Sequence, residues 1–509
     1  MNTTQPTLIL KARALASYAF ALLVATSLQA QTNAPVPPEG TLSTPYRVEV
    51  VASRLQAPWS VVFTPDDRIF FSERPGWIRV IENGRVLDNP ALVLPDVAAS
   101  VKMGLLGLAV DPGFTTNRFI YAAYDYDRGK ENYRLRVVRF RENANWLIEP
   151  HTLIENIPAW RNHTGCRLRF GPDGCLYITT GDANDPPRAQ RLDSLAGKIL
   201  RLNSDGSIPA DNPFVGRTNA NGAIWSYGHR NPQGLDFQPG TGVLYNSEHG
   251  PDNGDEVNLT MKGANYGWPE IHHRLSREGM RNPMLEFTPS VGPAALLFYR
   301  GNAFPELKGK MLLGCLRGEG ILRIGMEGTN AIFYDRLLHF QYGRIRDVTE
   351  GPDGYIYFTT SQFDPPEGTP RPEYDYILRL VPKSAPSTGA ALAAPWNGPR
   401  PVEPAFNPNT TNAADIVTMF CASCHGPGLR GGMQRGLLYG NWQFAKDDES
   451  MQRLIHNGLG DKGMPAFGAA LKPEQIASVI HYIRSNQTNQ PEPLRPTALK
   501  PPGAKGEFE

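Results

Sequence analysis

Cysteine, an excess of charge of either sign and long apolar runs are all scarce in this 509-residue sequence. With only five cysteines, the chain is not a small scaffold held together by disulfides. The 51 Lys and Arg side chains nearly balance the 50 Asp and Glu side chains, and a formal net charge of +1 gives no reason to expect nucleic acid as a partner. The length, by contrast, predicts at least two folded units.

The apolar runs are all shorter than the roughly 20 residues that a membrane-spanning helix needs. The longest covers residues 15–28, comes after Lys11 and Arg13, and is followed by a small residue, Ala30. This arrangement predicts a cleaved signal peptide at residues 1–30 rather than a membrane anchor. We therefore expect a bacterial protein that is periplasmic or secreted, and that is not integral to a membrane once the signal is removed.

Glycine and proline are abundant, at 50 and 46 residues, and favour an all-β structure rich in turns. The sequence Gly-Pro-Asp-Gly occurs at 171–174 and at 351–354, each time before a run of β-branched and aromatic residues that predicts a hairpin. Weaker copies begin at Pro65, Pro112, Pro239 and Pro305. Six copies that are 47 to 67 residues apart predict a six-bladed β-propeller within residues 46–383. A pair of β-sandwiches with accidental turns is the alternative.

The repeat also predicts where a functional site would lie. If each turn joins the two inner strands of a blade, the residues that flank the hairpins gather at the opposite face of the propeller. These flanking residues are Lys102, His163, Asp182, Arg230, Asn231, Glu248, His249, Gly250, Arg317, Arg344 and Arg346. Several cations that converge near one axis need an anionic partner.

His163 and Asp182 flank the same predicted hairpin, so a histidine–aspartate pair is geometrically reasonable. A carboxylate bonded to one ring nitrogen would leave the other nitrogen to act as a base. A purely structural hydrogen bond is an equally good interpretation of the residues alone.

A change of composition follows the propeller. Residues 384–410 are rich in proline and small residues and predict a semi-stiff linker. Residues 411–487 predict a small all-α domain, because apolar residues recur at helical spacing after Pro473. Residues 488–509 are expected to be a flexible tail.

Cys421, Cys424 and His425 form a C-x-x-C-H motif. In a haem c site the two thiols are joined covalently to the haem and the histidine becomes an axial iron ligand. A zinc half-site or a redox disulfide is the alternative for the cysteine pair alone. We expect Met464 as the second axial ligand, with Met433 and Met451 as rivals. This domain resembles the class I cytochrome c family over its whole length.

The propeller region contains six further short motifs. They are Gly-Leu-Leu-Gly at 104–107, Asn-His at 162–163, Gly-Asp at 181–182, Tyr-Gly-His-Arg-Asn-Pro-Gln-Gly at 227–234, Ser-Glu-His-Gly-Pro at 247–251 and Arg-Ile-Arg-Asp at 344–347. Through these motifs the region resembles the soluble glucose/aldose sugar dehydrogenases that use pyrroloquinoline quinone (PQQ). The resemblance implies a six-bladed propeller that holds PQQ and Ca²⁺. It also implies an enzyme that oxidises an aldose sugar, or a related polyol or aldehyde, by hydride transfer to PQQ.

The resemblance implies catalytic roles for three residues. His163 matches the general base that takes a proton from the sugar, and Asp182 matches the carboxylate that orients this base. Arg230 matches the residue that contacts the reactive quinone carbonyl and stabilises its developing negative charge. Electrons would then pass to the covalent haem and on to an external acceptor such as a cytochrome, a quinone or a respiratory chain.

Further residues match positions that hold the cofactor and the metal. Asn231, Arg344 and Arg346 match PQQ contacts, and the backbone carbonyls of Gly250 and Pro251 match Ca²⁺ ligands. Oxygen ligands suit a hard cation such as Ca²⁺.

Two positions depart from the family pattern. Arg317 stands where the family usually has a lysine against PQQ, and Lys102 stands where it usually has glutamine. Each change keeps a hydrogen-bond donor, and Lys102 adds a cation beside the expected cofactor.

Two other functions stay open at this level. One is a calcium-dependent propeller lactonase or hydrolase with an appended cytochrome, and the other is a non-catalytic propeller that docks a redox partner. The remaining cysteines, Cys166, Cys175 and Cys315, are expected to be buried thiols.

Overall fold

The computed structural model describes residues 39–391 apart from 100–101, 252, 274, 363–373 and 388–389. It also describes residues 411–488 apart from 422–424, 426–428, 430–436, 441, 443, 460–463, 465 and 469. The predicted signal peptide, most of the predicted linker and nearly all of the predicted tail lie outside these residues. The chain divides into two compact units between Gly398 and Pro399.

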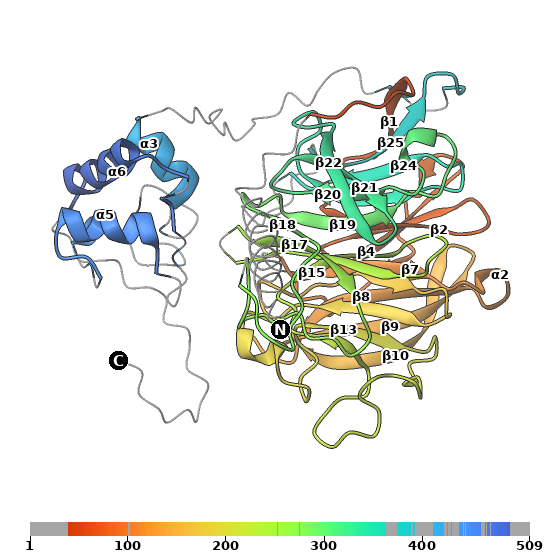
Figure 1. Ribbon diagram of the computed structural model, residues 1–509. Coiled ribbons are helices and arrows are strands. Elements are labelled where there is room, and N and C mark those ends of the chain that lie inside the picture. The colour runs from red at the N-terminus through yellow and green to blue at the C-terminus, as the bar shows by residue number, and fades with distance from the viewer. Residues whose placement is uncertain are drawn as a thin grey trace, which may run out of the picture. The chain divides into compact units, whose positions relative to one another are not determined.

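The described residues of the first unit form six antiparallel sheets, and the sequence-based prediction of a six-bladed propeller is confirmed (Figure 1). Blade 1 holds β2 (Pro58–Phe63), β3 (Ile69–Glu73), β4 (Trp77–Glu82), β5 (Arg85–Val86) and β6 (Leu92–Val93). Blade 2 holds β7 (Leu105–Val110), β8 (Phe119–Asp127), β9 (Tyr133–Asn143) and β10 (Trp146–Pro158). Blade 3 holds β11 (Leu168–Phe170), β12 (Leu176–Thr180), β13 (Lys198–Leu202) and β14 (Ile224–Tyr227).

The other three blades follow the same order. Blade 4 holds β15 (Pro232–Phe237), β16 (Leu244–Glu248), β17 (Asp255–Thr260) and β18 (Leu285–Phe287). Blade 5 holds β19 (Pro293–Phe298), β20 (Met311–Cys315), β21 (Gly320–Glu327) and β22 (Asn330–Leu337). Blade 6 holds β23 (Ile345–Glu350), β24 (Ile356–Thr360), β25 (Tyr376–Pro382), β1 (Tyr46–Ser53) and β26 (Ala390–Ala391).

The first strand of each blade lies nearest the propeller axis. β2, β7, β11, β15, β19 and β23 contact one another in a closed ring, which only the innermost strands of a propeller can do. The six prolines of the sequence repeat each lie in the turn between the first and second strand of a blade. The residues that flank these hairpins therefore lie at the opposite face, as the sequence predicts.

The two full copies of the repeat fold in the same way. Asp173 accepts a hydrogen bond from the amide of Cys175 at 3.1 Å, and its other oxygen accepts one from the hydroxyl of Tyr177 at 3.0 Å. Asp353 makes the equivalent bonds to Tyr355 and Tyr357, at 3.0 and 2.8 Å. The same turn chemistry therefore produces the same hairpin twice.

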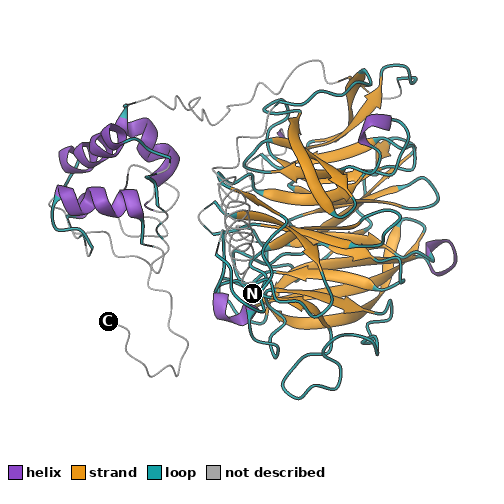
Figure 2. Ribbon diagram, viewed as in Figure 1, coloured by secondary structure: helices purple, strands orange, loops and turns teal. Residues whose placement is uncertain are grey.

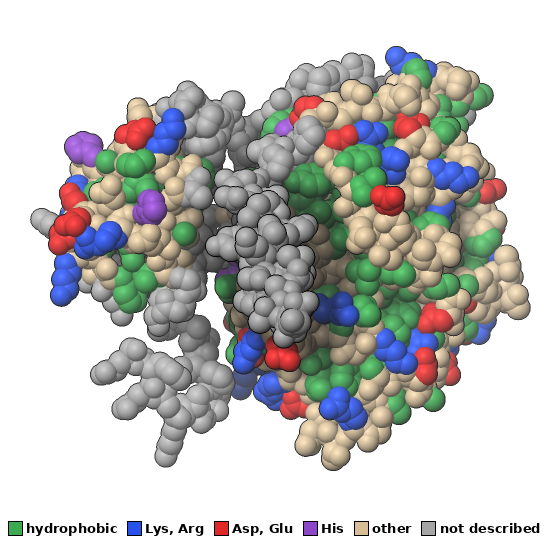
Figure 3. Space-filling view, in the orientation of Figure 1, with side chains coloured by type: hydrophobic (Ala, Val, Ile, Leu, Met, Phe, Trp, Pro, Cys, Tyr) green, Lys and Arg blue, Asp and Glu red, His purple; other side chains and the backbone are tan. Residues whose placement is uncertain are grey.

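The ring is closed by the N-terminal strand. β1 pairs antiparallel with β25, with Tyr46 opposite Pro382, so blade 6 contains strands from both ends of the domain. In the described residues of this unit, helix occurs only in short connections: α2 (Phe114–Asn117), η1 (Pro186–Ala189) and η2 (Pro305–Leu307) (Figure 2). On the face visible in Figure 3, acidic and basic side chains are interspersed, in keeping with the balanced composition.

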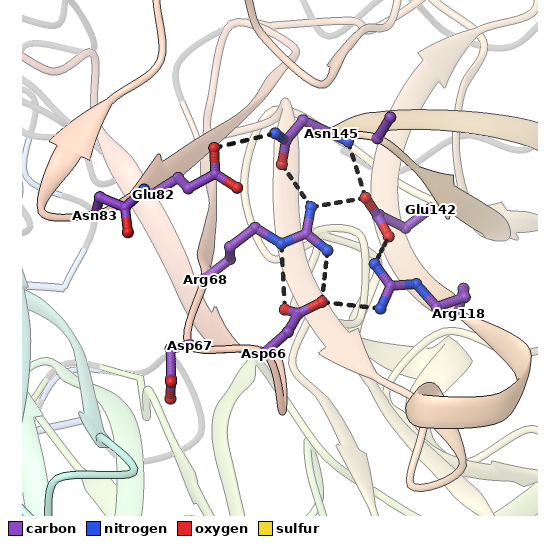
Figure 4. Close-up of a pocket in the computed structure, with 9 residues that line it drawn as sticks. Asp66, Asp67, Arg68, Glu82, Asn83, Arg118, Glu142 and Asn145 are labelled. Carbon is purple, nitrogen blue, oxygen red and sulfur yellow. Dashed lines mark hydrogen bonds and ion pairs between the residues drawn. The ribbon is translucent and has the colours of Figure 1, made fainter.

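A ring of ion pairs joins blades 1 and 2 beside a hollow of about 370 Å³ (Figure 4). Arg68 bonds Asp66 at 2.8 Å and the buried Glu142 at 2.7 Å. Arg118 bonds the same two carboxylates. Because each charge faces partners of opposite sign, this cluster is built as a structural tie between blades.

The second unit contains short helices, α3 (Ala413–Ile416), η4 (Val417–Cys421) and η6 (Leu437–Tyr439), and longer ones, α5 (Asp448–Asn457) and α6 (Pro473–Ser485). α6 begins at the predicted proline and buries its predicted apolar face, which includes Ile476 and Ile480. Met451 and Ile455 of α5 belong to the same core. The prediction of a small all-α domain is confirmed.

Candidate active site

The predicted histidine and aspartate lie at the face opposite the turns. His163 precedes β11, and Asp182 follows β12 after a single glycine. A side chain at Gly181 would place its Cβ 2.0 Å from the carbonyl oxygen of His163, so the two backbone segments can approach this closely only at a glycine. Local sequence thus brings the two side chains together.

His163 and Asp182 form a direct pair. Nδ1 of His163 lies 2.8 Å from Oδ1 of Asp182, whose side chain is fully buried. The backbone amide of Asn184 also donates to Oδ1 at 2.8 Å, and the indole Nε1 of Trp268 donates to Oδ2 at 2.8 Å. A carboxylate that accepts all three bonds requires the proton of the imidazole on Nδ1, which leaves Nε2 as the basic nitrogen.

The surroundings keep this imidazole neutral. Burial, together with the nearby charges of Arg230 and Lys102, lowers the pKa of His163 below its usual value, although Asp182 acts in the opposite direction. Burial acts to raise the pKa of Asp182, but hydrogen bonds from His163 and Trp268 outweigh it and hold that pKa below its usual value. At neutral pH the pair is therefore a neutral base beside a carboxylate.

Arg230 and Asn231 approach the pair from the segment between β14 and β15. The backbone amide of Arg230 donates to Glu248 at 2.7 Å, and its guanidinium donates to the carbonyl of His249 at 3.0 Å. The side-chain oxygen of Asn231 accepts from the amide of Gly165 at 3.2 Å. These bonds fix both residues beside the loop that carries His163.

The neighbouring His229 has a different role. Its ring is fully buried, lies 2.9 Å from both Ser226 and Glu248, and stacks on Tyr266 with centroids 4.6 Å apart. Both ring nitrogens are occupied, so this histidine supports the fold and cannot act as the base.

Several cationic side chains lie close together at the face of the propeller that carries His163. Burial, with repulsion from Arg230, Arg344 and Arg346, lowers the pKa of Lys102 to about 8. Burial likewise lowers the pKa of Arg344 to about 10. Arg346 is 4% exposed and donates to Gln233 at 2.7 Å. Cations that repel one another so strongly fit a ligand with several negative charges.

His249 flanks a predicted hairpin, but neither the repeat nor the family resemblance assigns it a role. Burial and the surrounding cations lower its pKa well below the usual value, so the ring is neutral. Within the part of the chain that the structure describes, its buried Nε2 has no hydrogen-bond partner. An orphaned buried polar atom beside a cationic cluster is a further sign of a ligand site.

Arg317 lies beside the buried cations, but it is exposed. Its side chain donates to Asn253 at 3.2 Å. Arg344 donates to the carbonyl of Leu316 at 3.2 Å, so Arg317 occupies the rim next to the cluster.

Gly250 and Pro251 offer backbone carbonyls. The amide of Gly250 donates to Asp255 at 3.1 Å, and the carbonyl of Pro251 accepts from Gly254 at 2.9 Å. Among the described residues, no group of three or more His, Cys, Asp or Glu side chains could hold a metal. Since Ca²⁺ takes six to eight oxygen ligands, two carbonyls fit it only where a bound ligand and water supply the others.

The expected haem ligands lie in the second unit. Cys421 and Met464 are both partly buried against the same apolar cluster, and paired backbone hydrogen bonds with Leu459, at 2.8 and 3.0 Å, fix Met464. His425 is half-buried, and Cys424 lies outside the described residues. A thioether and a cysteine on one apolar core fit a covalently bound haem.

The three other cysteines, Cys166, Cys175 and Cys315, are free and buried, as expected. Burial raises the pKa of the Cys315 thiol to about 12, and it also raises the pKa values of Cys166 and Cys175. None of the three is therefore a reactive thiolate.

Each of the two units matches a known protein family. Residues 55–366 match the family model described as "Glucose / Sorbosone dehydrogenase". The chain belongs to this family, and it is an enzyme of the sugar dehydrogenase class. Residues 408–483 match the model described as "Cytochrome C oxidase, cbb3-type, subunit III", which confirms the cytochrome c domain.

Named relatives agree with this assignment. The chain is 34% identical to aldose sugar dehydrogenase YliI of Escherichia coli over 333 residues, which are 62% of this chain and 90% of the relative. It is 35% identical to quinoprotein glucose dehydrogenase B of Acinetobacter calcoaceticus over 254 residues, 44% of this chain and 52% of the relative.

A solved structure shows the same propeller. The PQQ-bound form of aldose sugar dehydrogenase from Streptomyces coelicolor superposes with a TM-score of 0.58 and 31% identity, over 68% of this chain and 99% of that one. The family match favours oxidation over the lactonase and docking alternatives. None of the described helices has both the length and the apolar character needed to cross a bilayer.

Proposed function

We propose that this chain is an exported quinohaemoprotein that oxidises an aldose sugar, or a related polyol or aldehyde, and passes the electrons through its own haem c to an external acceptor. The observation that carries the proposal is the pair of His163 with the buried carboxylate of Asp182, at 2.8 Å, beside Arg230 and a cationic cluster. The family and the cytochrome domain support the same reading.

Bound here, PQQ would supply a two-electron oxidant, Ca²⁺ would supply positive charge against it, and haem c would carry electrons singly. Lys102, Arg344 and Arg346 would hold the negative groups of the quinone cofactor, and their mutual repulsion would fall as they do so. The carbonyls of Gly250 and Pro251 would be the protein's share of the Ca²⁺ ligands.

His163 would act on the sugar. Its Nε2 would accept the proton of the hydroxyl that is oxidised, while Asp182 holds the ring and stabilises the imidazolium that results. Arg230 would donate to the carbonyl oxygen of the quinone, where negative charge would accumulate as the hydride leaves the sugar. Burial of the pair excludes water from the proton that moves.

The cytochrome domain would receive electrons within the same chain. A covalent linker raises the effective concentration of a partner domain wherever it can span the distance between the two sites. Fusion therefore would make the transfer independent of a diffusing first acceptor.

The test is reconstitution of the haem-loaded protein with PQQ and Ca²⁺, followed by a panel of aldoses. We expect the reduced absorption bands of the haem to develop only when all components are present, and not in His163→Gln. A wild-type protein that binds PQQ but leaves its haem oxidised with every sugar and aldehyde would overturn the proposal.

A further inference from the structure

A long segment of blade 4 reaches across to the blade that carries the His–Asp pair. It joins β17 to β18 and contains Trp268, which sequence analysis did not single out. The indole Nε1 of Trp268 lies 2.8 Å from Oδ2 of Asp182, which is 86 residues away in the chain. The guanidinium carbon of Arg230 lies 5.3 Å from the centre of the same indole ring. One side chain thus contacts both the carboxylate and the cation of the proposed centre.

The segment is held firmly in this place. The amide of Trp268 donates to the carbonyl of Gly228 at 2.9 Å, and its own carbonyl accepts from the side chain of Gln190 at 2.8 Å. Gln190 and Asn265 exchange two further hydrogen bonds between their amide groups, at 3.0 and 2.8 Å. These residues lie on two blades, so the indole is positioned by both.

The backbone at Gly228 lies very close to the segment that carries Trp268. A Cβ on Gly228 would lie 2.2 Å from the side-chain oxygen of Asn265, and Gly228 has a φ of +77°. Only glycine fits that position without displacing the segment.

We propose, on the basis of the proposed function, that Trp268 is a positioning residue that fixes the orientation of Asp182, and through it the basicity of His163, while its ring holds Arg230 in place. The indole N–H occupies the carboxylate oxygen that does not face the imidazole. Asp182 is therefore locked with its other oxygen toward His163, and part of its charge is directed away from the ring.

Removal of the indole N–H of Trp268 should change the basicity of His163. The charged and titratable groups that face His163 are Asp182, Arg230, Lys102 and His249. Without the indole N–H, the charge of Asp182 is shared with one donor fewer and acts more strongly on the imidazole. The pKa of His163 then rises, so the base is lost to protonation at a higher pH.

The experiment uses Trp268→Phe, which keeps an aromatic ring for Arg230 and removes only the donor. The matched control is Trp225→Phe in blade 3, because the indole N–H of Trp225 has no hydrogen-bond partner among the described residues. In the reconstituted enzyme we expect Trp268→Phe to lower kcat roughly ten- to hundredfold, the range for losing one hydrogen bond to a charged group. We expect little change in the KM for sugar, and an acid limb of the kcat/KM profile displaced to higher pH.

A second readout does not depend on turnover. Titration of ¹⁵N-labelled His163 by NMR in the cofactor-free protein should give a higher pKa in Trp268→Phe than in the wild type, and an unchanged one in Trp225→Phe. If Trp268→Phe folds poorly, β-(3-benzothienyl)alanine at position 268 keeps the bicyclic ring and removes the N–H.

Each outcome has one meaning. Equal His163 pKa values in the wild type and the Trp268 variants, or equal shifts in the Trp225 control, would overturn the positioning role. Failure of the wild type to oxidise any sugar would overturn the proposed function instead, and the NMR comparison would still decide the role of Trp268.

Discussion

Replacing Asp182 with asparagine tests whether His163 must donate from Nδ1 to a carboxylate for Nε2 to act as the base. The carboxylate of Asp182 accepts from three donors, namely His163 Nδ1, the amide of Asn184 and the indole of Trp268, each at 2.8 Å. An asparagine has one oxygen and one NH₂ group, so it cannot face all three donors with acceptors.

Both orientations of the asparagine amide are unfavourable. With its oxygen toward His163, its NH₂ group opposes the indole N–H of Trp268 and leaves a buried donor unmatched, at a cost of about 1–3 kcal/mol. With its NH₂ group toward His163, the imidazole must accept on Nδ1 and carry its proton on Nε2. That tautomer has no base directed at the substrate, so the second orientation abolishes the chemistry.

We expect Asp182→Asn to lower kcat about 10³-fold, within the range of about 10² to 10⁴ that general base catalysis supplies. The assay is stopped-flow reduction of the haem after reconstitution with PQQ and Ca²⁺. Asp173→Asn is the matched control, because Asp173 lies in the same hairpin at the turn end. It should alter stability alone.

The pH profile gives a second measure. The pKa of His163 is below its usual 6.5, so the acid limb of the wild-type kcat/KM profile should lie below pH 6.5, where the imidazole becomes protonated. A variant that retains more than a tenth of wild-type kcat, with the same acid limb, would refute our account of the pair.

Three other changes test separate parts of the molecule. Arg68→Met removes one partner of the buried Glu142, which Arg118 still pairs, and should lower the free energy of unfolding by about 1.5–3 kcal/mol in urea denaturation. Because the pKa of Glu142 is depressed, the loss should shrink as acid protonates it, and a loss independent of pH would contradict the ion-pair assignment. Lys102 has a pKa of about 8 and is charged below it, so PQQ affinity of the cofactor-free protein, measured by calorimetry, should weaken as pH rises through 8, and Lys102→Gln should remove that dependence. Met464→His should lower the haem reduction potential in a redox titration, and an unchanged potential would exclude Met464 as an axial ligand.

The architecture could be predicted from sequence because it is locally encoded. Asp173 and Asp353 make the same turn contacts. The strand that follows each of these two turns is buried on both faces, so its apolar residues form a continuous run. The helix from Pro473 to Ser485 could also be predicted, from the helical spacing of its apolar residues. Within these elements the contacts that decide the structure are a few residues apart.

The site could be predicted only in part. The repeat placed His163 and Asp182 at one face, but it did not show that the neighbouring His229 is enclosed by Ser226 and by Glu248 of another strand. Trp268 was missed because its contact with Asp182 joins two blades through an irregular segment. Glycine at 228 is a signal of close approach, yet it does not identify what approaches.

The closing strand of blade 6 has a consequence for the order of events in the cell. β1 must wait for β25, which is made more than 300 residues later, before the pairing of Tyr46 with Pro382 can form. Contacts of such long sequence separation form slowly, because chain entropy is lost before they stabilise the fold. The cations from blades 2, 4 and 6 meet only in a closed ring, so we expect assembly to be sequential: closure first, cofactor loading second. A cofactor that arrived before ring closure would contact only part of the cationic cluster.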